Sequence, residues 1–121
     1  MIQGLGNDII EISRIEKAIQ RYGQRFLDRI FTAKEQSYCL RHHQSGQHFA
    51  GRFAAKEAIV KALGIGFREG ITWLDIEILN DTYGKPTVFL SQSLQDAHPN
   101  SQVLISISHC KEYASAVAIL L

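Results

Sequence analysis

The sequence lacks several features that would indicate an oxidising or membrane environment. It contains only two cysteines, Cys39 and Cys110, among its 121 residues. Two cysteines so far apart do not form a disulfide framework, and they suit a reducing compartment. No apolar run approaches the roughly 20 residues that a membrane span requires, and the N-terminus lacks the basic and apolar regions of a signal peptide. We therefore expect a cytoplasmic protein without a membrane partner.

Charge of one sign is also missing. The chain has 13 Lys and Arg against 12 Asp and Glu, which gives a net charge of +1 at pH 7. This balance provides no bulk attraction to nucleic acid, so we expect no nucleic acid partner. Because 45% of the residues are hydrophobic, the chain can bury a core of its own, and we expect a single domain over 1–121.

Several well-known site motifs are absent as well. The sequence contains no phosphate loop, no dinucleotide fingerprint and no nucleophile elbow. Cys39 with His42 and His43 resembles half of a zinc site, but no second cysteine and histidine cluster lies nearby in the sequence. We therefore do not expect zinc.

Hydrophobic periodicity predicts helices in the first half of the chain and strands in the second. A Thr32 and Glu35 capping box begins one helix, and Gly64 ends the longest one. The final hairpin has two apolar faces, so we expect it at the centre of the sheet or at a subunit contact. These elements predict an α+β fold, with a mainly antiparallel sheet packed against helices. The expected strands cover 2–9, 74–78, 87–90, 103–108 and 114–121, and the expected helices cover 11–22, 26–30, 32–42, 49–63 and 91–97.

The helix expected over 49–63 has charges in unusual places. Lys56 falls on its apolar stripe, and Glu57 lies at the flank of that stripe beside small alanines. A carboxylate half removed from water needs a cation, a metal or hydrogen-bond donors. The alternative is a surface ion pair from Glu57 to Lys61, worth about 0.3 to 0.5 kcal/mol, and this helix alone favours that alternative.

Asp8 is the second carboxylate that solvation explains poorly. Gly4 and Gly6 precede it on the first expected strand and leave room for a close approach to the backbone. We expect Asp8 at the turn into the next helix, where the alternative is a simple N-cap. If Asp8 and Glu57 meet, their oxygens suit a magnesium ion that keeps its waters and bridges substrate phosphates, and Lys61 could reach such a phosphate.

Polar side chains also gather where the strand over 103–108 ends. Ser106, Ser108 and His109 occur there, and the ends of strands often carry binding groups. The alternative for His109 is an incidental surface residue, since the chain has five histidines.

The first expected helix carries a basic stripe on an otherwise neutral chain. Arg14, Lys17 and Arg21 share one face, and Arg25 follows just past the helix end. Guanidinium groups in such a stripe can dock an acidic helical partner. The alternative is a solvated face balanced by Glu11 and Glu16.

Three separated motifs together resemble one known family. Gly4-Leu5-Gly6-Asn7-Asp8-Ile9-Ile10-Glu11 with Arg14 is the first, Arg52-Phe53-Ala54-Ala55-Lys56-Glu57-Ala58 with Lys61-Ala62-Leu63-Gly64 is the second, and Ile107-Ser108-His109 before Ala114 and Ala116 is the third. The set resembles the 4'-phosphopantetheinyl transferases, and its length and spacing resemble their small bacterial type. One departure is Asn7, where many relatives carry threonine or valine, but it leaves the Asp8 carboxylate intact.

The resemblance implies an activity and a partner. The activity is transfer of the 4'-phosphopantetheine arm of coenzyme A to a serine of an apo acyl carrier protein, in support of fatty acid biosynthesis. It also implies magnesium as the cofactor and a homotrimer with sites between subunits. Lys56 has no firm role by this resemblance, and we expect its ammonium either at a subunit contact or extended toward coenzyme A.

The resemblance also implies roles for individual residues. Asp8 and Glu57 match the magnesium ligands, and both count as catalytic together with Lys61, which lies near the transferring phosphate. Arg14 and Arg21, with Arg25 beside them, match the carrier-docking face. The expected coenzyme A contacts are Lys61, Gly64, Lys85 and Pro86 of the Gly84-Lys85-Pro86 turn, Ser108 and His109.

Two rival functions remain open from the residues alone. One is a magnesium-dependent nuclease, in which Asp8 and Glu57 clamp a phosphodiester, although further acidic ligands and a basic surface are missing. The other is a non-catalytic binding module whose basic helix docks an acidic protein and whose Glu57 is merely paired. Magnesium-dependent binding of coenzyme A separates both from the transferase.

Overall fold

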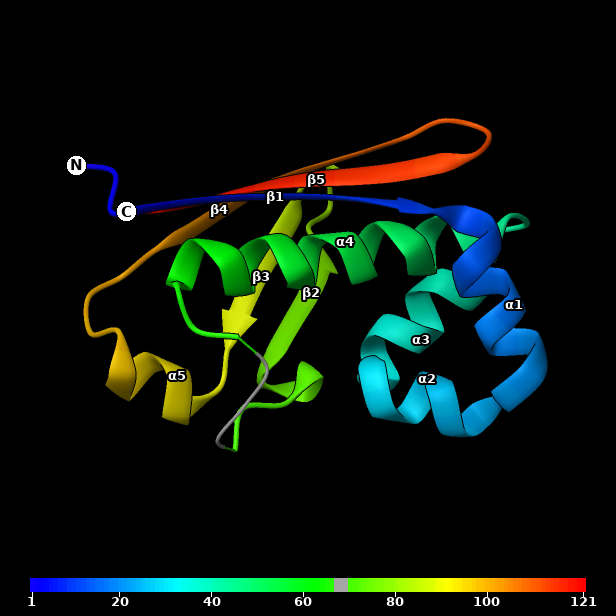
Figure 1. Cartoon of the computed structure of the whole chain (residues 1–121), viewed down its shortest axis with the longest axis horizontal. Coiled ribbons are helices and arrows are strands. Elements are labelled where there is room, and N and C mark those ends of the chain that lie inside the picture. The colour runs from blue at the N-terminus through cyan, green and yellow to red at the C-terminus, as the bar shows by residue number, and fades with distance from the viewer. Residues whose placement is uncertain (67–69) are drawn as a thin grey trace.

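The structure is a computed structural model that describes residues 1–66 and 70–121 (Figure 1). Its order is mixed: one strand, four helices, a hairpin, a short helix and a second hairpin. The strands are β1 (Gly4–Glu11), β2 (Ile76–Asn80), β3 (Pro86–Leu90), β4 (Val103–His109) and β5 (Tyr113–Leu120). The helices are α1 (Ile12–Tyr22), α2 (Gln24–Ile30), α3 (Ala33–Leu40), α4 (Ser45–Leu63) and α5 (Gln92–Ala97), with a 3-10 turn η1 (Trp73–Asp75).

The strands form two antiparallel sheets, which confirms the expected α+β fold. The larger sheet has the order β1-β5-β4, and β2 pairs with β3 in the smaller one. The helix α4 runs along one face of the larger sheet, with α1 to α3 gathered at one end of the molecule and α5 at the other (Figure 1). The termini lie close together, and the Gln3 amide donates to the Leu120 carbonyl at 2.7 Å.

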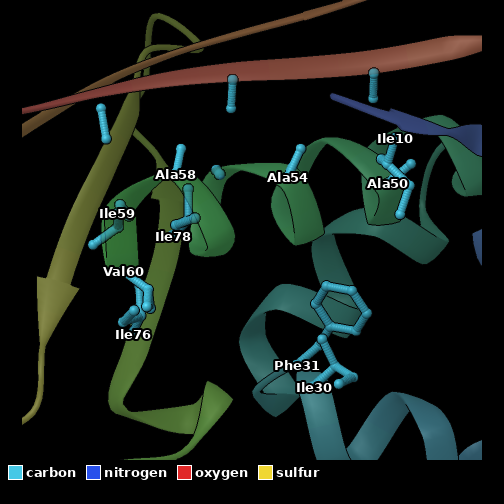
Figure 2. Packing of buried hydrophobic residues seen from close by; sticks show 14 of the residues in the cluster. Ile10, Ile30, Phe31, Ala50, Ala54, Ala58, Ile59, Val60, Ile76 and Ile78 are labelled. Atoms are coloured by element: carbon cyan, nitrogen blue, oxygen red, sulfur yellow. The ribbon is translucent and has the colours of Figure 1, made fainter. Parts of the chain in front are cut away.

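Small residues let α4 lie unusually close to the sheet. A Cβ atom added at Gly4 or Gly6 would stand 2.0 Å from the carbonyl oxygen of Ala62 or Ala58. No side chain fits at that distance, so the close approach predicted for this glycine-containing strand is made by α4 itself. Ala54 and Ala58 point from α4 toward β5, which is itself lined by buried alanines (Figure 2). Since Asp8 follows Gly6 on the same face, this contact fixes where its carboxylate lies.

Most predicted elements are correct, and the differences concern their ends. The strand β1 continues to Glu11, so Asp8 lies within the strand and pairs with Ala116. Because Glu11 is the N-cap of α1, the interpretation of Asp8 as a cap is wrong. The helix α4 begins at Ser45, earlier than expected. Leu74, expected as the first residue of the strand over 74–78, lies in η1 and is 46% exposed.

The hairpin of β4 and β5 was expected at the centre of the sheet or at a subunit contact, and only one of its strands is central. The strand β5 is central in the larger sheet, but β4 is an outer strand. Both helix signals are confirmed, because Thr32 and Glu35 form the capping box of α3 and Gly64 adopts a left-handed conformation at the end of α4. No helix in the described part of the chain is long and apolar enough to cross a membrane.

Lys56 lies in the core, and both expectations for it are wrong. Its side chain is 0% exposed, and its Nζ donates to Glu35 Oε1 at 2.8 Å and to the Ile30 carbonyl at 2.7 Å. A third bond of 3.1 Å joins it to the Trp73 carbonyl. Glu35 in turn accepts from the Ile78 amide at 2.8 Å through Oε2. The ammonium therefore connects helices α2, α3 and α4 with η1, and it reaches neither a subunit surface nor a ligand.

Candidate functional site

Asp8 and Glu57, here called the acidic pair, come together between β1 and α4. Lys61 lies one helical turn beyond Glu57, and its Nζ is 3.2 Å from Asp8 Oδ1 and 2.9 Å from the Asn7 carbonyl oxygen. The Lys61 side chain is 52% exposed and that of Asp8 19% exposed. The structure therefore assembles the three predicted catalytic residues, from two distant segments, at a position that solvent reaches.

The electrostatics of the acidic pair are unfavourable for two free carboxylates. The pKa of Glu57 is raised, first because the carboxylate is partly buried and then because the Asp8 carboxylate repels its charge, while Lys61 opposes both effects. Within the described residues, Glu57 forms no hydrogen bond and no ion pair. Its ionised form thus lacks the compensation that a half-buried carboxylate needs.

This geometry decides between the two interpretations of Glu57. The expected surface pair from Glu57 to Lys61 does not form, because Lys61 pairs with Asp8 on the neighbouring strand instead. The close approach of β1 to α4 brings the aspartate within reach of the lysine. The alternative that the isolated helix favoured is therefore wrong.

The acidic pair has the chemistry of a magnesium site with few protein ligands. Two carboxylates can neutralise a divalent cation, and Mg²⁺ often keeps several waters and binds through one or two carboxylates plus substrate phosphates. Among the described residues, no group of three or more His, Cys, Asp or Glu side chains could hold a metal ion. The chemistry of these two carboxylates thus fits a magnesium ion that takes its other ligands from water or phosphate.

His109 lies elsewhere, in a cluster of rings that the sequence analysis missed. Its ring centroid is 5.8 Å from that of His48, which stacks on His42 at 3.9 Å. Tyr38 lies edge-on to His48 at 5.8 Å. We call His42, His48, His109 and Tyr38 the histidine cluster. His42 and His48 stand only six positions apart in the sequence, but nothing local indicates that both meet a strand end sixty residues later.

The surroundings of His48 favour the neutral form of its ring. The pKa of His48 is lowered to about 4, mainly because the ring is partly buried and also because His42, Arg52 and His109 add positive charge. A neutral imidazole both donates and accepts a hydrogen bond. Cys39, the third member of the half zinc site, is buried in the core.

The acidic pair and His109 lie on opposite sides of α4. Glu57 and His48 are nine residues apart on this helix, which at 100° per residue turns them to opposite faces. In the sheet, β5 separates Asp8 on β1 from the strand that ends at His109. Ser108 is exposed on the sheet face away from α4, since neighbouring side chains alternate along a strand. One chain therefore does not bring its two groups of predicted ligand contacts together.

The remaining predicted ligand contacts line exposed edges. Lys85 and Pro86 stand at the start of β3 and border a groove of about 640 Å³ between β3 and β4. Gly64 is exposed at the end of α4, about two turns past Glu57. Neither position contacts His109 in the described residues.

The basic stripe lies on the outer side of α1. Arg14, Lys17 and Arg21 are exposed there, and Arg25 is exposed in the first turn of α2 rather than in a loop. The balancing pairs with Glu11 and Glu16 do not form within the described residues. Glu16 instead lies against Gly46 at the start of α4. The stripe is therefore available to an acidic partner.

Comparisons with known proteins agree on one family. The family model described as 4'-phosphopantetheinyl transferase superfamily matches residues 4–118. The chain is similar to the holo-[acyl-carrier-protein] synthase of Protochlamydia amoebophila, with 59% identity over 119 residues that cover 98% of each chain. It is also similar to the solved structure of the Helicobacter pylori holo-[acyl-carrier-protein] synthase in complex with coenzyme A, with 35% identity, a TM-score of 0.89 and coverage of 97% and 99%. The Neisseria meningitidis holo-[acyl-carrier-protein] synthase structure gives 33% identity, a TM-score of 0.90 and coverage of 100% and 99%.

Proposed function

Because this chain belongs to the 4'-phosphopantetheinyl transferase superfamily, we propose that it transfers the 4'-phosphopantetheine arm of coenzyme A to a serine of an apo acyl carrier protein. The observation that carries the proposal is the acidic pair with Lys61 at an open position between β1 and α4. The nuclease and the non-catalytic module gain no support from the comparisons. The reaction is that of a holo-[acyl-carrier-protein] synthase, and we place it in fatty acid biosynthesis in the cytoplasm.

The chemistry replaces a phosphoanhydride bond of coenzyme A by a phosphoester bond to the carrier serine. The serine oxygen of the carrier attacks the phosphorus that bears the pantetheine arm. The bond from this phosphorus to the bridging oxygen breaks, and adenosine 3',5'-bisphosphate leaves with the electron pair. Such a transfer depends mainly on positioning and on stabilising charge. The protein therefore has to hold the phosphates, accept the serine proton and stabilise the negative charge on the leaving adenosine 3',5'-bisphosphate.

The acidic pair fits the metal that this chemistry uses. Asp8 and Glu57 would hold a magnesium ion, which when bound neutralises charge on the pyrophosphate. Glu57 has no partner among the described residues, and its raised pKa makes it a better proton acceptor than a free carboxylate. The serine proton goes either to Glu57 or to an ordered water.

Lys61 is suited to a change of partner. Without substrate it pairs with Asp8 at 3.2 Å, and its side chain is half exposed. An exposed pair of this kind is worth about 0.2 to 1 kcal/mol, so a phosphate can replace the carboxylate at little cost. The ammonium then stabilises the charge that develops on the departing phosphate.

The larger sheet supports a homotrimer with sites between subunits. The sheet face away from α4 exposes several large apolar side chains, with Leu5 on β1 67% exposed and Leu104 on β4 and Val117 on β5 both exposed. Large exposed apolar patches typically mark interfaces. Copies of the same chain are the occupants we propose. Assembly would also let the acidic pair of one protomer share a site with His109, Ser108 and the Lys85-Pro86 edge of its neighbour.

The decisive test of the proposed transfer replaces the Glu57 carboxylate by an amide of nearly the same shape. We expect Glu57→Gln to reduce transfer by about 10²- to 10³-fold, because the acidic pair loses a charged ligand while the fold is unchanged. Mass spectrometry of apo carrier protein with coenzyme A and magnesium measures the added phosphopantetheine. Glu112→Gln, which changes an exposed acid in the turn between β4 and β5, is the matched control. Full conversion by Glu57→Gln would contradict the proposal.

The carrier-docking role of the basic stripe is tested separately. We expect neutralising Arg14 and Arg21 together to raise the KM for the carrier about tenfold or more at low salt, with little change in kcat. The difference from wild type should shrink as salt screens the charges. Carrier kinetics that do not respond to ionic strength would contradict docking by this face.

A further inference from the structure

Arg52 is a buried cation without an anionic partner. Arg52 is only 3% exposed, yet no carboxylate forms an ion pair with it in the described part of the chain. Its Nε donates to the Ile78 carbonyl at 3.2 Å, its guanidinium carbon lies 4.3 Å from the centre of the Tyr38 ring, and its Nη2 donates to Asn80 Oδ1. A buried charge held only by neutral groups is costly, so its hydrogen bonds are specific rather than incidental.

Asn80 transmits this contact to the neighbouring turn. Its Oδ1 must face Arg52, because a guanidinium has only donors. The amide nitrogen therefore points the other way, and it donates to the Gly84 carbonyl at 2.8 Å. A charged donor on one side of the amide polarises it and strengthens the bond on the other side. Asn80 thus joins α4 to the turn that precedes Lys85 and Pro86.

The turn has few other ways to be held. Asp81 closes it from within, since its Oδ1 accepts from the amides of Tyr83 and Lys85 at 2.8 and 2.9 Å. Gly84 adopts a φ of +84°, which other residues rarely adopt. Pro86, the ladder partner of Asn80, has no N–H to donate across the hairpin. Among the described residues, the side chain of Asn80 makes the only side-chain hydrogen bond from outside residues 81–85 to this turn.

We propose that Arg52 and Asn80 are positioning residues that fix the Gly84-Lys85-Pro86 turn in the shape that binds the nucleotide part of coenzyme A. This inference rests on the proposed function. The buried guanidinium orients the Asn80 amide, and the amide fixes the Gly84 carbonyl, so that Lys85 and Pro86 meet the nucleotide without first being ordered. Neither Arg52 nor Asn80 needs to touch the ligand for this role.

Asn80→Asp separates positioning from stability. The carboxylate keeps a partner for Arg52 and forms an ion pair with it, but it cannot donate to the Gly84 carbonyl and repels that oxygen. We expect a thermal midpoint no lower than that of wild type. We expect the KM for coenzyme A to rise about tenfold with kcat within twofold, because the ordering of the turn is then required at binding.

The matched control adds the same charge to the same turn. Thr82 is exposed and its side chain forms no hydrogen bond in the described structure, so Thr82→Asp introduces a carboxylate without breaking the contact to Gly84. We expect its KM for coenzyme A to stay within about threefold of wild type. An equal rise in both variants would reduce the effect to charge repulsion and overturn the positioning role, as would an unchanged KM in Asn80→Asp.

Amide hydrogen exchange on the substrate-free protein tests the contact independently of activity. In Asn80→Asp we expect exchange at the Gly84 and Lys85 amides to be at least fivefold faster than in wild type, and in Thr82→Asp to be close to wild type. If the wild-type chain transfers no phosphopantetheine, the proposed function fails, while faster exchange still supports the turn-holding contact. Unchanged exchange at both amides overturns the inference whatever the activity is.

Discussion

Lys56 and Glu57 are neighbours in the sequence, but the fold treats their charges in opposite ways. Lys56 is fully buried and donates to one carboxylate and two carbonyl oxygens at 2.7 to 3.1 Å. Glu57 is partly exposed, has no hydrogen-bond partner among the described residues and faces a like charge on Asp8. One helical step of 100° therefore separates a structural charge from a site charge.

The difference shows how the two kinds of charge can be told apart. A structural charge has its hydrogen bonds satisfied within the chain, so that removing it leaves a hole and an unpaired partner. A site charge is left uncompensated because a ligand is to compensate it. The titratable side chains along α4 can be compared in this way, and each prediction below tests one of them.

The largest expected effect is on the structural side. We expect Lys56→Met to lower the free energy of unfolding by about 3 to 5 kcal/mol, because Glu35 then lies in the core as an uncompensated charge. Urea denaturation measures this loss. The double variant Lys56→Met with Glu35→Met should recover only part of it, since Glu35 also accepts from the Ile78 amide and closes the capping box of α3. A loss below 1 kcal/mol in the single variant would remove the contrast with Glu57.

A smaller effect is expected at His48, on the face of α4 opposite Glu57. The folded protein holds the pKa of His48 at about 4, against 6.5 for the free side chain. As the pH falls from 6.5 toward 4, the unfolded chain binds the proton first, so stability is complete above pH 6.5 and is lost as the pH falls. Because the ring is only partly buried, solvent screening reduces the total loss to about 1 kcal/mol.

The comparison for this prediction is His48→Phe, which keeps a ring in the histidine cluster but cannot titrate. Its unfolding free energy should change less between pH 6.5 and 4 than that of wild type, as measured by urea denaturation at several pH values. Identical pH profiles would show that protonation of His48 does not oppose folding.

The smallest effect has the opposite sign to that at Lys56. The raised pKa of Glu57 means that its ionisation costs stability once the pH rises through the folded value, so at neutral pH the site is destabilised. We expect Glu57→Gln to raise Tm by about 1 to 2 °C without magnesium, which corresponds to a few tenths of a kcal/mol. Adding magnesium should raise Tm in wild type more than in this variant. A lower Tm in Glu57→Gln would assign Glu57 to the structural class.

Local signals predicted much of the fold. The capping box at Thr32 and Glu35, the left-handed stop at Gly64 and the alternation along β2 to β5 depend on neighbours only a few residues away. The residues raised the meeting of Asp8 with Glu57 only as a condition, and the family resemblance implied it by matching both to magnesium ligands. The roles of these residues, the single domain and the magnesium ion stay predictions.

Contacts between distant segments could not be predicted. The partners of Lys56 come from three other elements. Lys61 forms its ion pair with Asp8 on β1 and not with Glu57, which lies on the same helix as Lys61. From the sequence, Arg52 stood out only as part of the second family motif. Its hydrogen bond to Asn80 joins α4 to β2, and no local pattern indicates such a contact. The histidine cluster likewise joins α4 and the turn before it to the end of β4.

By itself, the sequence determined most of the elements and two of their caps, and it singled out Asp8 and Glu57 as carboxylates that solvation explains poorly, because periodicity, capping and burial of charge act over one or two turns. Only the tertiary structure decided which charge is satisfied and which is left open. The glycines of β1 and the alanines of α4 set how closely strand and helix approach, and that approach brings Asp8 to Lys61 and beside Glu57, while Lys56 faces α2, α3 and η1. Charges adjacent in sequence thus differ in function because packing, not sequence distance, controls their surroundings.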